Sequence, residues 1–156
     1  MELTEEELQI KANALDFARK NKKRIAKEIA DTSIYQKEAS PVSVFMAGSP
    51  GAGKTEIAKA LIQQLADNGN KVLRIDADVL RERFDSYNGS NSHLFQAATS
   101  VLVEKLHDIA LDRKQSFILD GTLTNYAKAK HNIARSLGKK RPVAILYVHQ
   151  EPTQAW

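Results

Sequence analysis

The feature that most constrains the fold is an apolar run followed by a glycine-rich octapeptide and then by an amphipathic run. Residues 42–47 (VSVFMA) are mostly apolar and rich in β-branched and aromatic side chains, which is typical of a buried strand. The octapeptide GSPGAGKT follows, and from Lys54 to Asp67 apolar residues recur at three- and four-residue spacing. This order predicts a buried strand, a tight loop and a helix.

The octapeptide satisfies the P-loop pattern G-x-x-x-x-G-K-[ST] in the strand–helix setting that the pattern requires. Its glycines let backbone N–H groups point at phosphate oxygens, and the helix N-terminus adds partial positive charge. We expect ATP here, with Lys54 acting on the phosphates during transfer and the Thr55 hydroxyl on Mg²⁺. The predicted nucleotide-binding residues are Gly48, Ser49, Pro50, Gly51, Ala52, Gly53, Lys54 and Thr55. The sequence contains no NKxD-like guanine-reading motif, and the compact size favours a kinase over a motor.

Strand-like and helix-like segments alternate along the whole chain. Further strands are predicted at residues 71–75, 116–120 and 143–148, and helices at residues 4–38, 54–67, 93–111 and 125–137, with a short one after residue 76. Such alternation, with strands that are apolar throughout, predicts an α/β fold: a P-loop kinase-like parallel sheet with helices on both faces. We divide the chain into an N-terminal helical segment, residues 1–40, and a kinase domain, residues 41–156.

The N-terminal segment begins with a capping-box pattern, Thr4 followed three residues later by Glu7. Its apolar stripe comprises Leu8, Ala12, Leu15, Ala18, Ile25 and Ile29. Two interpretations follow: the stripe packs as part of the fold, or the segment covers the active cleft and restrains the enzyme.

The charge distribution leaves a second kind of partner open. The net charge is +4, and residues 113–141 supply the excess with eight Lys or Arg against one acid. Such a stretch can attract nucleic acid, although few aromatic residues accompany these lysines, or it can be a solvated surface. The sequence contains no cysteine, no apolar run long enough for a membrane span and no signal peptide, so we expect a cytoplasmic protein.

Acidic residues follow two of the predicted strands. Asp76 and Asp78 come after the second strand, and Asp120 ends the third. Ligands of open parallel sheets gather at the carboxyl ends of strands, and phosphoryl transfer needs a carboxylate to accept the proton of the acceptor hydroxyl. An aspartate after a strand can instead cap a helix, and for Asp76 both interpretations stay open.

Four elements in order, GSPGAGKT, RIDAD, Glu104 and LDGT, resemble the zeta toxin family of P-loop kinases. The resemblance implies a toxin that phosphorylates the 3′-hydroxyl of UDP-N-acetylglucosamine. It also implies an antitoxin protein as the partner of this toxin. It assigns Asp78 as the catalytic base, and Glu104, Asp120 and Thr122 as substrate contacts. The family commonly has glutamate where Asp120 stands, and an arginine where Thr124 stands.

The family also places two phosphate-gripping arginines after the strand that matches residues 143–148. This sequence ends in HQEPTQAW, so we expect the C-terminal lid to be missing. The chain is then either a fragment of a longer protein or a naturally shortened, weak enzyme. Two alternatives to the kinase stay open: an ATP-binding module whose catalysis is lost or completed by a partner, and, from the basic stretch at residues 113–141, a nucleic-acid end kinase.

Overall fold

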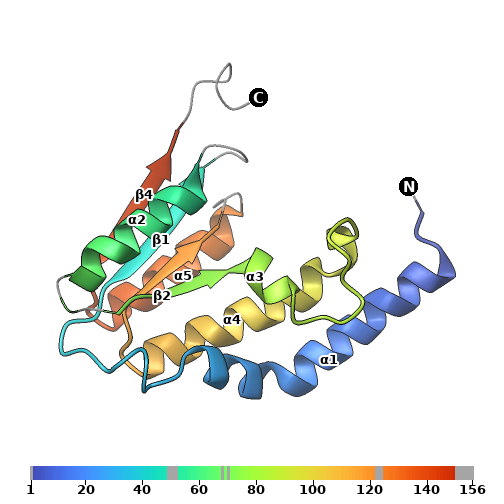
Figure 1. Cartoon of the computed structure of the whole chain (residues 1–156), viewed down its shortest axis with the longest axis horizontal. Helices are drawn as coiled ribbons and strands as arrows, with labels where there is room; N and C mark the ends of the chain where they lie inside the picture. The colour runs from blue at the N-terminus through green and yellow to red at the C-terminus, as the bar shows by residue number, and fades with distance from the viewer. Residues whose placement is uncertain (1, 49–52, 68, 70, 122–124, 150–156) are drawn as a thin grey trace. The chain divides into compact units, whose positions relative to one another are not determined.

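The computed structural model describes residues 2–48, 53–67, 69, 71–121 and 125–149. In chain order the elements are α1 (Glu5–Ile29), β1 (Ser43–Gly48), α2 (Lys54–Asp67), β2 (Leu73–Asp76), α3 (Ala77–Arg81), the 3₁₀ helix η1 (Ser92–Leu94), α4 (Gln96–Asp112), β3 (Phe117–Asp120), α5 (Tyr126–Gly138) and β4 (Val143–Val148) (Figure 1). The chain forms two compact units, residues 1–30 with 76–109 and residues 31–75 with 110–156. The division at residue 40 stays a prediction.

The second unit is built on a four-stranded sheet with the order β2-β3-β1-β4. β1 pairs in parallel with β3 and with β4, so Ser43 lies opposite both Phe117 and Val143. Met46 lies opposite Asp120, and Gly48 lies opposite Val148. The ends of β1, β3 and β4 therefore meet at one edge of the sheet, which confirms the parallel α/β fold.

Successive strand residues point to opposite faces of the sheet, so both faces carry apolar side chains, and helices cover both. On one face, α2 packs its apolar side on alternate strand residues such as Val44, Met46 and Ile118. On the other face, Phe45 meets Phe117 edge to face, and Ser136 of α5 donates a hydrogen bond to Ser43. β4 is an edge strand, and its Ile145 and Tyr147 remain 58% and 63% exposed.

The N-terminal helix begins as predicted and ends earlier than predicted. Thr4 and Glu7 form both hydrogen bonds of the capping box. The helix stops at Ile29, not residue 38, because the Asp31 carboxylate accepts from the backbone N–H and the hydroxyl of Ser33. This local turn competes with the helical hydrogen bonds. It also lowers the pKa of Asp31, chiefly through the Ser33 N–H.

The predicted apolar stripe of α1 is wrong in its first turns. Leu8 and Ala12 are exposed, and the buried residues of the helix are Ala14, Ala18, Ile25 and Ala26. Within the same unit, Phe17 packs edge to face on Phe84, which also contacts Phe95. The aromatic residues supply packing that the small alanines cannot.

The predicted helix at 93–111 is divided. Residues Ser92–Leu94 form η1, and α4 begins only at Gln96. Leu94 and Phe95 are both buried, so the turn between the two elements is fixed by packing. The helix at residues 54–67 and the strand at residues 143–148 have the bounds that the sequence predicted.

Candidate active site

The glycine-rich loop leaves β1 at Gly48, where no side chain fits. A Cβ atom on Gly48 would lie 2.5 Å from the carbonyl oxygen of Val148, which belongs to the neighbouring strand backbone. At the other end of the loop, Gly53 has φ +85°, a conformation that favours glycine. Residues 49–52, which include the predicted Ser49, Pro50, Gly51 and Ala52, lie outside the described residues. Both glycines that bound the loop therefore have a steric reason for their identity.

Lys54 begins α2 and lies against the end of β3. Its Nζ is 3.3 Å from Oδ1 of Asp120 and donates to the carbonyl oxygen of Gly121 at 3.3 Å. The two side chains are 17% and 8% exposed, so the pair is largely sheltered from water. The structure thus brings together two residues that the sequence predicted for the site from positions 66 residues apart.

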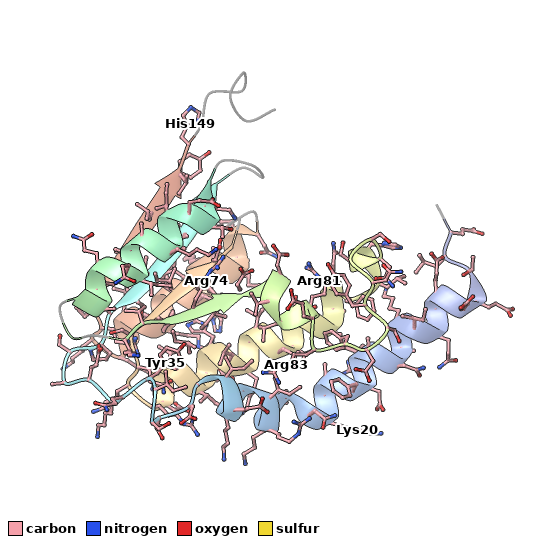
Figure 2. The ribbon with its side chains drawn as sticks, viewed as in Figure 1. Lys20, Tyr35, Arg74, Arg81, Arg83 and His149 are labelled. Atoms are coloured by element: carbon pink, nitrogen blue, oxygen red, sulfur yellow. The ribbon has the colours of Figure 1, made fainter. Side chains whose placement is uncertain are left out.

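A second cation meets the same carboxylate. Arg74 of β2 donates from Nη2 to Oδ2 of Asp120 at 3.1 Å, and its side chain is also largely buried (Figure 2). Sequence reasoning missed Arg74, whose only signal is a charged residue inside an otherwise apolar strand. Two cations on one carboxylate leave this cluster with a net charge of about +1, which favours binding of an anion such as a phosphate group.

The acids after β2 have separate roles. The Asp76 carboxylate accepts from the backbone N–H of Asp78 at 2.9 Å and so caps α3, which confirms the capping interpretation. Asp78 is 85% exposed, and its Oδ1 lies 2.8 Å from Nη1 of Arg81. Glu104 is exposed on α4. Asp76, Asp78 and Glu104 belong to the first unit, whereas Lys54, Arg74 and Asp120 belong to the second.

The remaining predicted residues concern Mg²⁺ and the acceptor. Thr55 is exposed in the first turn of α2, and Thr122 lies outside the described residues. Over the described ranges, no group of three or more His, Cys, Asp or Glu side chains is placed to hold a metal ion. The hydroxyl of Thr55 and the carboxylate of Asp120 are hard oxygen donors of the kind Mg²⁺ prefers, and this ion usually takes its other ligands from phosphates and water. The donor set therefore fits Mg²⁺ bound together with a nucleotide.

The class of P-loop kinase-like proteins is defined by a parallel sheet with a glycine loop between β1 and α2. In this chain the lysine that follows the loop, Lys54, pairs with Asp120 at the end of β3. The Zeta toxin family model matches residues 26–156, and the chain belongs to this family.

Solved structures share the fold. A chain from the PezAT chromosomal toxin-antitoxin system of the human pathogen Streptococcus pneumoniae is 19% identical with TM-score 0.73, over 99% of this chain and 61% of that one. APE1195 is 20% identical with TM-score 0.58, over 77% of this chain and 69% of that one. A chain of the AvrRxo1-ORF1:-ORF2 complex with ATP is 18% identical with TM-score 0.53, over 90% and 45%. This chain thus spans about three fifths of the PezAT chain.

No curated protein matches the chain. Among the helices that the structure describes, none combines the length and the apolar character that crossing a membrane requires.

Proposed function

We propose that the protein is an ATP-dependent kinase that transfers the γ-phosphoryl group to a hydroxyl of a nucleotide-linked sugar such as UDP-N-acetylglucosamine. The observation that carries this proposal is the cluster of Lys54, Asp120 and Arg74 beside the glycine loop. Membership of the zeta toxin family supports the phosphotransferase chemistry. The acceptor is taken from the family resemblance, and an antitoxin protein is the partner proposed with it.

The cluster suggests how the nucleotide is received. In the structure, Asp120 holds the Lys54 ammonium through a sheltered ion pair. Lys54 exchanges this carboxylate for the β- and γ-phosphates of ATP, while Arg74 stays on Asp120 and keeps its charge compensated. The Thr55 hydroxyl would hold Mg²⁺ together with the nucleotide, and the ion would supply charge neutralisation on the phosphate oxygens.

The proposed transfer balances in one step. The acceptor hydroxyl oxygen forms a bond to the γ-phosphorus, the bond from that phosphorus to the β,γ-bridging oxygen breaks, and ADP leaves. Asp78, whose exposed carboxylate pairs with Arg81 in the structure, is proposed to accept the hydroxyl proton. Glu104, Asp120 and Thr122 are proposed to contact the acceptor. We place this reaction in the cytoplasm, where ATP and nucleotide sugars are available.

The test is an assay of purified protein with Mg-ATP and a panel of UDP-sugars. We expect ADP and one phosphorylated UDP-sugar in equal amounts. Mass spectrometry identifies this product, and the position of its phosphate shows which hydroxyl was the acceptor. Tight ATP binding without any phosphorylated sugar would favour the binding module. Turnover on an oligonucleotide with a 5′-hydroxyl, with a steep salt dependence, would favour the nucleic-acid end kinase.

A further inference from the structure

The opposite end of the same sheet contains a pocket that the proposed reaction does not use. It has a volume of about 460 Å³ and is lined by the segments that precede β1, β3 and β4. Among the described residues that line it, four are cationic, Lys114, Lys139, Lys140 and Arg141, and one is acidic, Asp112. All of these residues belong to the second unit. Half of the eight cations of the basic stretch therefore line one pocket.

Two of the lysines have an unusual backbone conformation. Lys114 and Lys140, which follow the ends of α4 and α5, have φ angles of 53° and 58°. Glycine or asparagine is usual at such positions after a helix, because other side chains cost free energy there. Two lysines therefore have a strained backbone conformation, and both line the same pocket. Such strain points toward a function of the pocket.

The lysine side chains are not used to cap these helices. The Lys114 N–H donates to the carbonyl of Leu111, and the Lys140 N–H donates to the carbonyl of Leu137 at 2.9 Å. Backbone groups therefore already occupy these helix-end carbonyls. Within the described part of the chain, the ammonium groups of Lys114 and Lys140 have no ion pair, and Lys139 lies 3.8 Å from an Asp112 carboxylate that is itself 75% exposed.

Arg141 adds a buried charge to the pocket wall. The residue is 5% exposed, and its Nη2 donates to the carbonyls of Val42 and Gln115. Its Nε and Nη1 are buried and find no hydrogen-bond acceptor among the described residues. Burial lowers the pKa of Arg141 to about 10, although the charge of Glu38 acts in the opposite direction. The Glu38 carboxylate also accepts a hydrogen bond from the Ser116 hydroxyl.

We propose that this pocket is a second anion site, which binds a small molecule carrying two or more phosphate groups. Its volume lies in the range of small-molecule pockets, roughly 300–1,000 Å³. None of the described residues that line the pocket is aromatic, and single-stranded nucleic acid uses aromatic side chains as its stacking surface. Closely spaced cations in a concave wall suit a compact anion with several charges.

The site is separate from the glycine loop. The pocket lies at the amino ends of the strands, whereas Gly48 and Asp120 lie at the carboxyl ends. The six residues of β1 span roughly 20 Å at about 3.3 Å per residue. One compact ligand cannot occupy both sites, so the pocket is a site distinct from the glycine loop.

The experiment uses inorganic tripolyphosphate as the probe and calorimetry as the readout, on protein that carries Lys54→Ala to weaken the P-loop site. The pocket variant adds Lys114→Gln, Lys139→Gln and Lys140→Gln. The matched control adds Lys23→Gln, Lys128→Gln and Lys130→Gln, three exposed lysines that do not line the pocket and that remove the same charge. Circular dichroism and melting temperature verify that each variant is folded.

We expect one tripolyphosphate per chain in the Lys54→Ala protein, affinity weakened at least about tenfold in the pocket variant, and a change within about twofold in the control. Three results would overturn the proposal. The first is no binding of tripolyphosphate to the Lys54→Ala protein, and the second is an equal loss of affinity in the pocket and control variants. The third is that a 20-nucleotide single strand binds the Lys54→Ala protein more tightly than tripolyphosphate does, with a steep salt dependence, and that the pocket variant loses this binding.

Discussion

The two ends of the sheet both bury a cation, and they differ in what the cation contacts. At the carboxyl end, Lys54 contacts Asp120, a side chain, besides one loop carbonyl. At the amino end, Arg141 donates to two backbone carbonyls, those of Val42 and Gln115, and lies over the ring of Phe117. A side-chain partner can be exchanged for a ligand when a rotamer changes, whereas a carbonyl partner moves only with the backbone. The first arrangement suits binding and release, and the second holds the starts of β1 and β3 together.

Removal of the lysine from the carboxyl end is expected to have the largest effect. Lys54→Ala should abolish phosphoryl transfer and any growth toxicity, because the phosphates lose their charged contact while the glycines and the sheet are unchanged. Turnover and growth are the measurements. Lys59→Ala, at an exposed position on the same helix, is the control and should behave as the unmodified protein. Full activity of Lys54→Ala would remove the basis for the P-loop assignment.

Deletion of residues 1–38 tests chiefly the first unit, which contains residues 1–30. The deletion removes the buried residues Ala14, Ala18 and Ile25 and uncovers Phe84, so it should lower stability by several kcal/mol, at roughly 25 cal/mol per Å² of apolar surface. We expect an insoluble, inactive protein. Ala18→Asp, a point change at a fully buried position, should give the same loss in milder form. A soluble truncation with higher activity or toxicity would instead support the restraint interpretation.

Asp78→Asn separates the catalytic base from the helix cap. It should leave ATP affinity nearly unchanged and lower turnover by about 10²–10⁴-fold, the range for a positioned general base. Asp76→Asn is the control, because asparagine caps a helix as well as aspartate does. Steady-state kinetics with calorimetric ATP binding measures both. A crippled Asp76→Asn beside an active Asp78→Asn would show that the base has been assigned to the wrong residue.

A change at the amino end should affect stability and leave nucleotide binding intact. Arg141→Met keeps the volume and removes the donors to Val42 and Gln115, so we expect a loss of about 2–4 kcal/mol in the free energy of unfolding. Urea unfolding measures this loss. Lys140→Met, at the exposed neighbouring position, should change stability by less than about 0.5 kcal/mol. Equal losses in the two variants would contradict the structural role of Arg141.

Much of the carboxyl end could be predicted because its signals are local. The glycine pattern fixes Lys54 in the sequence, and parallel strands bring the ends of β1 and β3 together, so Asp120 was placed beside it. The role of Arg74 could not be predicted, because its contact with Asp120 depends on β2 lying next to β3. No local sequence pattern determines the order of strands in a sheet. The end of α1 was missed for a different reason, since helical periodicity continues past the turn that Asp31 and Ser33 form.

The amino end shows the opposite balance. Arg141 follows Lys139 and Lys140 in a basic run, and such a run resembles a solvated surface. Its burial arises from Phe117 and from carbonyls that are distant in sequence, so composition alone could not separate it from its neighbours. The buried charge became visible only with the fold.

The central claim is that nucleotide binding depends on Lys54 at the carboxyl end, whereas Arg141 at the amino end supports the fold. Urea unfolding of Lys54→Met and Arg141→Met, each with and without saturating Mg-ATP, tests this claim directly when both proteins also carry Lys114→Gln, Lys139→Gln and Lys140→Gln to weaken the proposed second anion site. The account predicts that Lys54→Met in this background unfolds like the background protein without nucleotide and gains almost nothing from ATP. It predicts that Arg141→Met starts less stable and gains the full ATP increment, about 2.7 kcal/mol at a hundredfold excess over Kd. An ATP increment kept by Lys54→Met, or lost by Arg141→Met, would contradict it.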